Sequence, residues 1–136
     1  MLTKKQLDHV KKYFATQPVD VVYLFGSQAT GKTNKFSDTD IGVLFKKSLT
    51  KSERFDLRMG MIDELIGLIK QNVDVVDLQE APIALKFSAV FPRKEILVRN
   101  NNRRAVFEAE TNSLYYDYVY YIKENTKTSL ISMSNM

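Results

Sequence analysis

Residues 23–45, YLFGSQATGKTNKFSDTDIGVLF, join two apolar runs across a polar segment. The first run ends at Gly26-Ser27, and the second begins beside two carboxylates, Asp38 and Asp40. Runs rich in β-branched and aromatic residues predict strands, here over residues 19–25 and 39–45, with a loop or short helical turn between them. Because consecutive strands usually pair, we expect Gly26-Ser27 and the carboxylate pair to face each other at one edge of the sheet.

The remainder of the chain alternates helical and strand patterns. Apolar residues at helical spacing predict four helices: residues 2–16, residues 51 to about 69, a helix with Pro82 as its first residue that ends before Pro92, and a helix from after residues 100–104 to about Lys123. Two further strands are predicted over residues 73–78 and 95–99. The tail, residues 124–136, has no periodicity, and we expect it to be frayed or disordered. This order indicates one α/β (α+β) domain over residues 1–136, with helices packed on a small mixed sheet.

Composition excludes several classes of protein. The 136 residues contain no cysteine and one histidine, so disulfides, thiolate metal sites and a zinc site are not expected. No apolar stretch is long enough for a membrane span and no secretory h-region is visible, so the cytoplasm is the expected compartment. A net charge of +4 suits an anionic ligand without specifically favouring nucleic acid, so direct nucleic-acid binding is not expected.

The two carboxylates of residues 38–40 suggest a metal site. Asp38 and Asp40 are two residues apart at the start of a strand, so both side chains leave the same face. They repel unless one is protonated or a cation lies between them, and oxygen ligands select Mg²⁺ or Mn²⁺. The strand over 73–78 offers Asp74 or Asp77 as a third carboxylate. Three carboxylates on neighbouring strands suit two cations about 3.5–4 Å apart, as used for phosphoryl displacement.

The glycine corner suggests a phosphate site. Gly26 has no side chain to block a phosphate, and Ser27 offers a hydroxyl and a backbone N–H. Lys32 adds a positive charge in the loop. The second glycine and the lysine do not fit the P-loop pattern, which we therefore reject. Together with the carboxylates, these residues predict a metal-bound nucleoside triphosphate.

The segment GSQATGKTNKFSDTD resembles the motif of the DNA polymerase β-like nucleotidyltransferase superfamily: Gly-Ser, ten residues, then Asp-x-Asp. The short chain, the stretch NVDVVDLQEAP and the tyrosine-rich last helix resemble the minimal nucleotidyltransferases, in particular MntA-type antitoxins of HEPN/MNT toxin–antitoxin pairs. The resemblance covers roughly residues 5–125. One departure is Gly42, at a position where many relatives carry a further acid.

The resemblance implies the residue roles. Asp38 and Asp40 bind two Mg²⁺ ions, with Mn²⁺ as an alternative, and a carboxylate on the later strand completes the metal and catalytic site. We assign that role to Asp74, which shares a strand face with Val76, and keep Asp77 as a rival. In the same scheme Gly26, Ser27 and Lys32 hold the phosphates of ATP.

The resemblance also implies the reaction and the partner. AMP moves from ATP to a hydroxyl, namely a tyrosine of a cognate HEPN toxin ribonuclease, so the chain acts as an antitoxin in a hetero-oligomer. The chain is too short for a separate acceptor-binding domain, which favours a protein partner. Two alternatives stay open: transfer to a small molecule of the aminoglycoside type, and a binding antitoxin without catalysis.

The helix that contains LYYDYVYYIKEN has two interpretations. A helix so rich in tyrosine cannot bury every ring on one face, so half of the rings pack in the core, or an exposed aromatic patch meets a partner. Arg99, Arg103 and Arg104 flank this helix and are expected in a solvated loop.

Overall fold

A computed structural model describes residues 2–25, 38–91 and 94–134 of the chain, with side chains in the last helix described as far as residue 126. The elements in chain order are α1 (Lys4–Ala15), β1 (Val19–Phe25), β2 (Thr39–Phe45), α3 (Lys51–Ile69), β3 (Val73–Asp77), α4 (Ile83–Val90), β4 (Glu95–Val98) and α5 (Asn101–Ser134).

The four strands form one mixed sheet in the order β3-β2-β1-β4. The central pair, β1 and β2, is antiparallel, β4 is antiparallel to β1, and β3 is parallel to β2. Every residue of β1 is buried, as expected for a central strand covered on both faces. The predicted mixed sheet and both predicted central strands are therefore confirmed.

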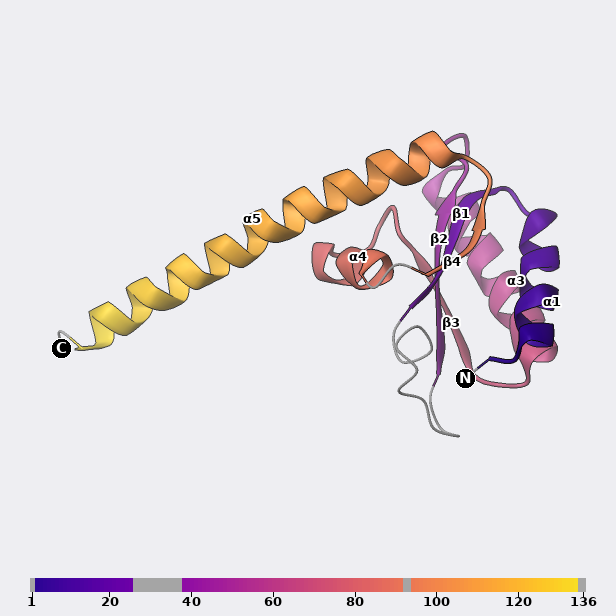
Figure 1. The fold of residues 1–136 in the computed structure, drawn as a ribbon, viewed down its shortest axis with the longest axis horizontal. Helices are drawn as coiled ribbons and strands as arrows, with labels where there is room; N and C mark the ends of the chain where they lie inside the picture. Colours follow the sequence, from indigo (N-terminus) through magenta and orange to yellow (C-terminus); the bar gives the residue numbers. More distant parts are fainter. Residues whose placement is uncertain (1, 26–37, 92–93, 135–136) are drawn as a thin grey trace.

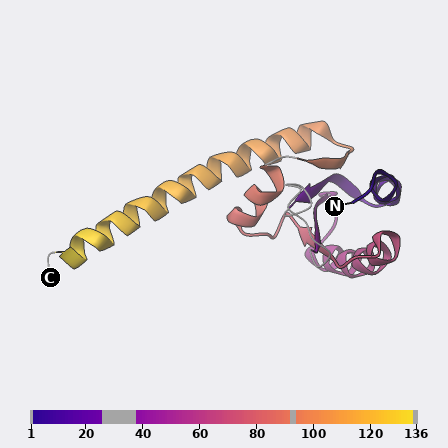
Figure 2. The ribbon, with the colours of Figure 1, turned by 60° about the horizontal axis from the view of Figure 1, so that its bottom comes forward.

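Helices cover both faces of the sheet (Figures 1 and 2). On one face, α1 and α3 pack over a core that includes Val22, Ile41 and Val75. On the other, α4 and the beginning of α5 pack over a second core that includes Leu44 and Leu78. The remainder of α5 projects away from the sheet (Figure 1). Among the described residues, no helix combines the length and the apolar character that a membrane crossing requires.

Local sequence signals explain where two of the helices begin. Thr3 caps α1 and Thr50 caps α3, and in each case the residue three positions later, Gln6 or Glu53, completes a capping box. These reciprocal hydrogen bonds satisfy backbone N–H groups that the first helical turn leaves without partners. The C-cap of α3 is Lys70, whose φ of 55° is left-handed.

Several predicted helix details are wrong. Pro82 is the N-cap of α4 rather than its first helical residue. Phe55 and Met59 belong to the apolar residues whose helical spacing indicated α3, yet both are exposed, and the buried residues of the helix include Met61 and Leu65. The predicted loop over 28–37 lies outside the described residues.

Helix α5 differs most from its prediction. It begins at Asn101 and continues to Ser134, well beyond the predicted end near Lys123. Arg103 is therefore in the first turn of a helix rather than in a solvated loop, and its guanidinium Nη1 donates to the buried carboxylate of Asp20 at 2.8 Å. Asn100, just before the helix, accepts a hydrogen bond from the Arg103 backbone N–H.

Candidate active site

The beginnings of β2 and β3 bring two of the predicted carboxylates together. In the parallel pairing of these strands, Asp40 is the register partner of Asp74. Residues directly opposite each other on neighbouring strands share a face of the sheet. Ile41, the next residue along β2, lies in the core under α1 and α3, so Asp40 and Asp74 lie on the opposite face, toward α4.

Asp38, the other carboxylate of the Asp-x-Asp motif, adjoins this pair. Asp38 directly precedes β2 and is exposed, as is Asp74, whereas Asp40 is half-buried. The pKa of the Asp40 carboxyl is raised above its usual range, first by burial and then by the negative charges of Asp74 and Asp38. Asp74 and Asp38 are thus each near enough to Asp40 to repel its negative charge, and a bound cation would relieve that repulsion.

Asp77, the rival of Asp74, occupies a different environment. Its side chain is buried, and Arg54 Nε donates to Asp77 Oδ2 at 2.7 Å. A second carboxylate, that of Glu80, accepts from Arg54 Nη2 at 2.7 Å, and the backbone N–H of Gln79 donates to Asp77 Oδ1. Asp77 therefore neutralises a buried arginine, and Asp74 is the acid of β3 that faces Asp40.

Sequence reasoning missed Arg54. The signal was present, because Arg54 precedes Met61 by seven residues and Leu65 by eleven, which places it on the buried stripe of α3. A cation on the core-facing stripe of a helix requires a buried anion as its partner. Asp77 in the strand beneath is that anion.

The end of β1, which leads into the glycine corner, lies beside the carboxylates. Gly26, Ser27 and Lys32 lie outside the described residues, so their predicted role in phosphate binding stays a prediction. The last residue of β1, Phe25, is the register partner of Asp40. The chain therefore leaves β1 directly beside the carboxylates, as the pairing of consecutive strands predicted.

The donor set suits a hard divalent cation. Asp38, Asp40 and Asp74 offer only oxygen atoms, the ligands that Mg²⁺ and Mn²⁺ prefer. In the part of the chain that the structure describes, no three His, Cys, Asp or Glu side chains already stand closely enough to hold a metal ion. Binding would therefore require side-chain rotation, which the exposure of Asp38 and Asp74 permits.

Packing explains why glycine, rather than a further acid, occupies position 42. It lies two residues after Asp40 and so shares its face of the sheet. A Cβ atom at Gly42 would lie 3.1 Å from Cδ1 of Leu78, which is completely buried. Leu78 thus occupies the space that a further acid at this position would need.

Comparison with known proteins identifies relatives of this chain. The family model for "Polymerase beta, Nucleotidyltransferase" matches residues 8–102. The protein adenylyltransferase MntA of Shewanella oneidensis is 30% identical over 97 residues, which cover 71% of this chain and 66% of MntA. The chain therefore matches just under two thirds of the length of that relative.

Solved structures share the fold. A crystal structure of a toxin–antitoxin with AMP-PNP superposes with a TM-score of 0.72 at 22% identity, covering 94% of this chain and 99% of the other. A complex of tri-AMPylated Shewanella oneidensis HEPN toxin with MNT antitoxin superposes with a TM-score of 0.65 at 21% identity, covering 91% and 98%. At these identities the likeness shows a common fold.

Proposed function

The chain belongs to the polymerase β nucleotidyltransferase family, and from this premise we propose that it is an antitoxin that transfers AMP from ATP to a tyrosine hydroxyl of a cognate HEPN toxin. The observation that carries the proposal is the pairing of Asp40 with Asp74 across β2 and β3, with Asp38 beside them. We further propose that residues 1–136 form a single nucleotidyltransferase domain, which acts in the cytoplasm as part of a hetero-oligomer with the toxin.

In this proposal Asp38, Asp40 and Asp74 hold two Mg²⁺ ions, or Mn²⁺ in their place. When bound there, the ions would neutralise the triphosphate and the negative charge that develops on the oxygens around its α-phosphorus during transfer. Gly26, Ser27 and Lys32 hold the β- and γ-phosphates, so that the bond to the leaving group lies opposite the attacking oxygen.

Asp74 is also the proposed general base for the acceptor hydroxyl. Its exposed carboxylate accepts the proton of the acceptor hydroxyl. The hydroxyl oxygen then bonds to the α-phosphorus, the bond from the α-phosphorus to the bridging oxygen breaks, and pyrophosphate leaves. The product is AMP joined to the acceptor by a phosphodiester bond.

Two comparisons support a protein as the acceptor. The relative from Shewanella oneidensis is named a protein adenylyltransferase. One structural neighbour holds a HEPN toxin that carries AMP groups. Small-molecule transfer has no comparable support.

The test is transfer of labelled AMP from ATP to a cognate HEPN toxin. We expect Asp40→Asn and Asp74→Asn each to lower the rate by at least about 100-fold, because each removes a group that stabilises the transition state. Asp63→Asn is the matched control, since Asp63 is an exposed carboxylate on α3. Full activity of Asp74→Asn would contradict the assignment.

The same variants separate catalysis from simple contact. A catalytic antitoxin loses neutralisation of the toxin when Asp38 and Asp40 are both replaced by Asn, even if the two proteins still bind. A binding antitoxin retains neutralisation in that variant. Retention would contradict the proposal.

A further inference from the structure

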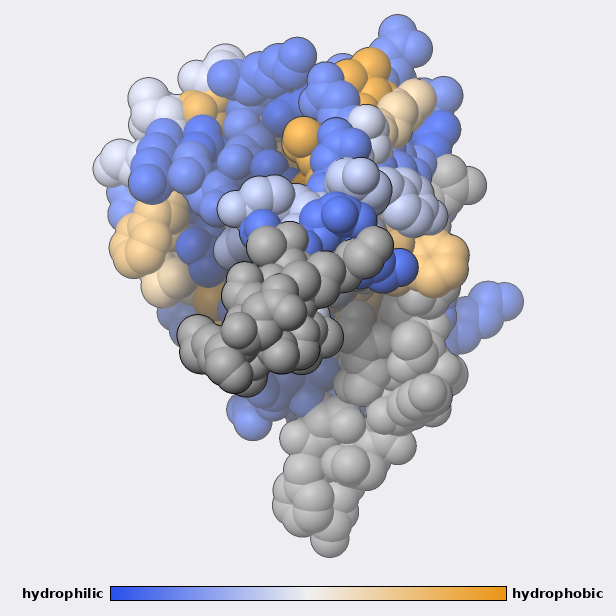
Figure 3. Space-filling model, turned by 90° about the vertical axis from the view of Figure 1, so that its left-hand side faces the viewer, coloured by the Kyte–Doolittle hydropathy of each residue, from blue (hydrophilic) through white to orange (hydrophobic). Residues whose placement is uncertain are grey.

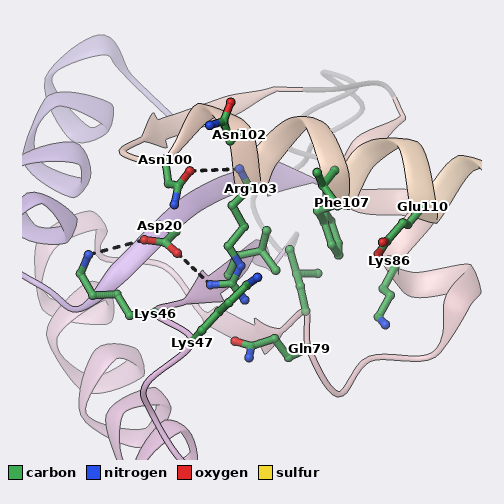
Figure 4. Close-up of a pocket in the computed structure, with 13 residues that line it drawn as sticks. Asp20, Lys46, Lys47, Gln79, Lys86, Asn100, Asn102, Arg103, Phe107 and Glu110 are labelled. Atoms are coloured by element: carbon green, nitrogen blue, oxygen red, sulfur yellow. Dashed lines mark hydrogen bonds and ion pairs between the residues drawn. The ribbon is translucent and has the colours of Figure 1, made fainter.

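A pocket lies away from the three carboxylates of the candidate active site. A pocket of about 760 Å³ opens between the end of β2, the turn after β3, α4 and the first turns of α5 (Figure 4). Leu44 and Lys46 line it, whereas Asp40 stands at the beginning of the same strand. The pocket and the candidate active site are therefore at opposite ends of β2.

The pocket is positively charged. Four cationic side chains line it against two carboxylates: Lys46, Lys47, Lys86 and Arg103 against Asp20 and Glu110. Asp20 is already neutralised, by Arg103 at 2.8 Å and Lys46 at 3.5 Å.

Two of the cations remain available to a ligand. Within the described residues, neither Lys47 nor Lys86 has an ion-pair partner.

A buried oxygen in the wall lacks a hydrogen bond. Gln79 lines the pocket, and its Oε1 atom is buried without a partner among the described residues. The backbone N–H of Gln79 donates to Asp77 Oδ1 at 3.0 Å, which helps to fix the turn that carries it. A buried acceptor without a partner costs free energy, so rotation of the Gln79 amide toward an occupant with an N–H or O–H donor would be favoured.

The pocket also has an apolar wall. Leu44, Leu78, Val106 and Phe107 line it, and the Phe107 ring lies between Arg103 and Lys86 in Figure 4. A flat apolar group can pack against such a ring. Pockets that bind small molecules commonly combine apolar walls with a few polar groups in this way, and the volume lies in their usual range.

We propose that this pocket binds a phosphate ester with a flat apolar body and an N–H donor, which is the chemistry of a mononucleotide. Lys47 and Lys86 bind the phosphate, Gln79 Oε1 accepts from the donor, and Phe107 packs against the flat body. A bare anion would leave Gln79 Oε1 without a donor. This site needs no divalent cation and is separate from the transfer reaction proposed above.

The test uses the full chain in EDTA, so that metal-dependent binding at the carboxylates is absent. AMP, adenosine and pyrophosphate are titrated by calorimetry, and the bound site is mapped by backbone amide NMR shifts. We expect AMP to bind at least tenfold more tightly than adenosine, and Lys47→Ala with Lys86→Ala to weaken AMP at least tenfold, because two charged hydrogen bonds are lost.

Two further variants sharpen the test. Lys5→Ala with Lys12→Ala removes the same charge from exposed positions on α1, and should change AMP affinity less than twofold. Gln79→Leu should weaken AMP about three- to tenfold, the effect of one lost hydrogen bond, and leave pyrophosphate unchanged.

Three results would overturn the proposal. They are the absence of AMP binding at millimolar concentration, equal effects of the two double-lysine variants, and NMR shifts centred on Asp40 and Asp74 rather than on Gln79 and Phe107. AMP transfer to the toxin by the Lys47→Ala, Lys86→Ala variant is measured in a separate assay. Failure at this pocket therefore leaves the proposed transfer reaction untouched.

Discussion

The pair between Arg54 and Asp77 gives the first prediction at the scale of single residues. Arg54→Met leaves the Asp77 carboxylate buried without its cation. Removal of one partner from a buried pair typically costs about 3–5 kcal/mol, and we expect a loss of that size in the free energy of unfolding. Urea denaturation measures it.

Two controls belong with this prediction. Lys51→Ala removes only the exposed contact between Lys51 and Glu80 at 3.6 Å, and should cost about 1 kcal/mol or less. Arg54→Met combined with Asp77→Leu removes both buried charges, and should recover most of the lost stability. An Arg54→Met chain as stable as the original would show that Asp77 does not depend on this arginine.

Asp40 gives a prediction about pH. Its pKa is raised by burial and by Asp74 and Asp38, so the folded chain holds this proton more tightly than the unfolded chain. The stability contributed by protonated Asp40 is therefore lost as pH rises from the ordinary value of 3.8 through the raised pKa. In EDTA at pH 7, Asp40→Asn should exceed the original chain in stability by about 1 kcal/mol or less.

The measurement is the melting temperature of both chains as a function of pH. The difference should vanish below the ordinary pKa of an aspartate, where the original carboxyl is protonated in both states. Adding Mg²⁺ at pH 7 should raise the melting temperature of the original chain more than that of Asp40→Asn, since binding to the folded state stabilises it. An Asp40→Asn chain that is less stable at pH 7 would contradict the inferred repulsion.

The choice between Asp74 and Asp77 shows what sequence can and cannot decide at this scale. A strand period of two places residues 74 and 77 on opposite faces, and the sequence predicts that much. The parallel register of β2 and β3 decides that Asp74, rather than Asp77, lies opposite Asp40. The position of Arg54 on α3 explains why Asp77 is buried. Both depend on tertiary packing between elements that are distant in sequence.

At the scale of elements, stacked rings join α5 to α4. The rings of Phe87 and Tyr115 are parallel within 5°, with centroids 3.7 Å apart, and Phe87 also stacks on Phe91. Tyr115→Ala removes this contact and part of the buried area. We expect a loss of about 1–2 kcal/mol in the free energy of unfolding, measured by urea denaturation.

Tyr120→Ala is the matched control for Tyr115→Ala. Tyr120 is on the same helix, but 68% of its surface is exposed. Substitution of such a residue usually changes stability by less than about 0.5 kcal/mol. Equal effects of the two variants would mean that the Phe87 stack does not anchor α5.

The two central strands and the end of α5 show why some elements were predictable. Dense β-branched runs with polar ends predicted β1 and β2 with their observed bounds. The end of α5 was not predictable from periodicity, because most of this helix projects from the sheet and has no single face to bury. Four apolar residues at helical spacing indicated this helix, and of these only Phe107 packs against the core, whereas Leu114, Tyr118 and Ile122 are exposed.

At the scale of the whole molecule, exposed aromatic residues concentrate on the projecting helix. In the view of Figure 3, most of the described surface is hydrophilic and its hydrophobic residues form small separate patches. Four tyrosines along α5 are exposed, namely Tyr116, Tyr118, Tyr120 and Tyr121. Tyrosine is enriched at protein interfaces because it combines a large apolar surface with a hydrogen-bonding group. We therefore expect the proposed HEPN toxin to contact this part of α5.

A pair of single substitutions tests that contact. Tyr120→Glu places a charge where a ring would be buried in the complex, and should weaken toxin binding about tenfold or more, while the melting temperature of the free chain stays unchanged. Phe55→Glu is the control, because Phe55 is also an exposed aromatic residue, at 55%, but lies on α3 across the sheet from α5. It should leave toxin affinity within twofold of the original. If Phe55→Glu weakens the complex and Tyr120→Glu does not, the toxin binds the face formed by α1 and α3, and the exposed tyrosines of α5 have another role.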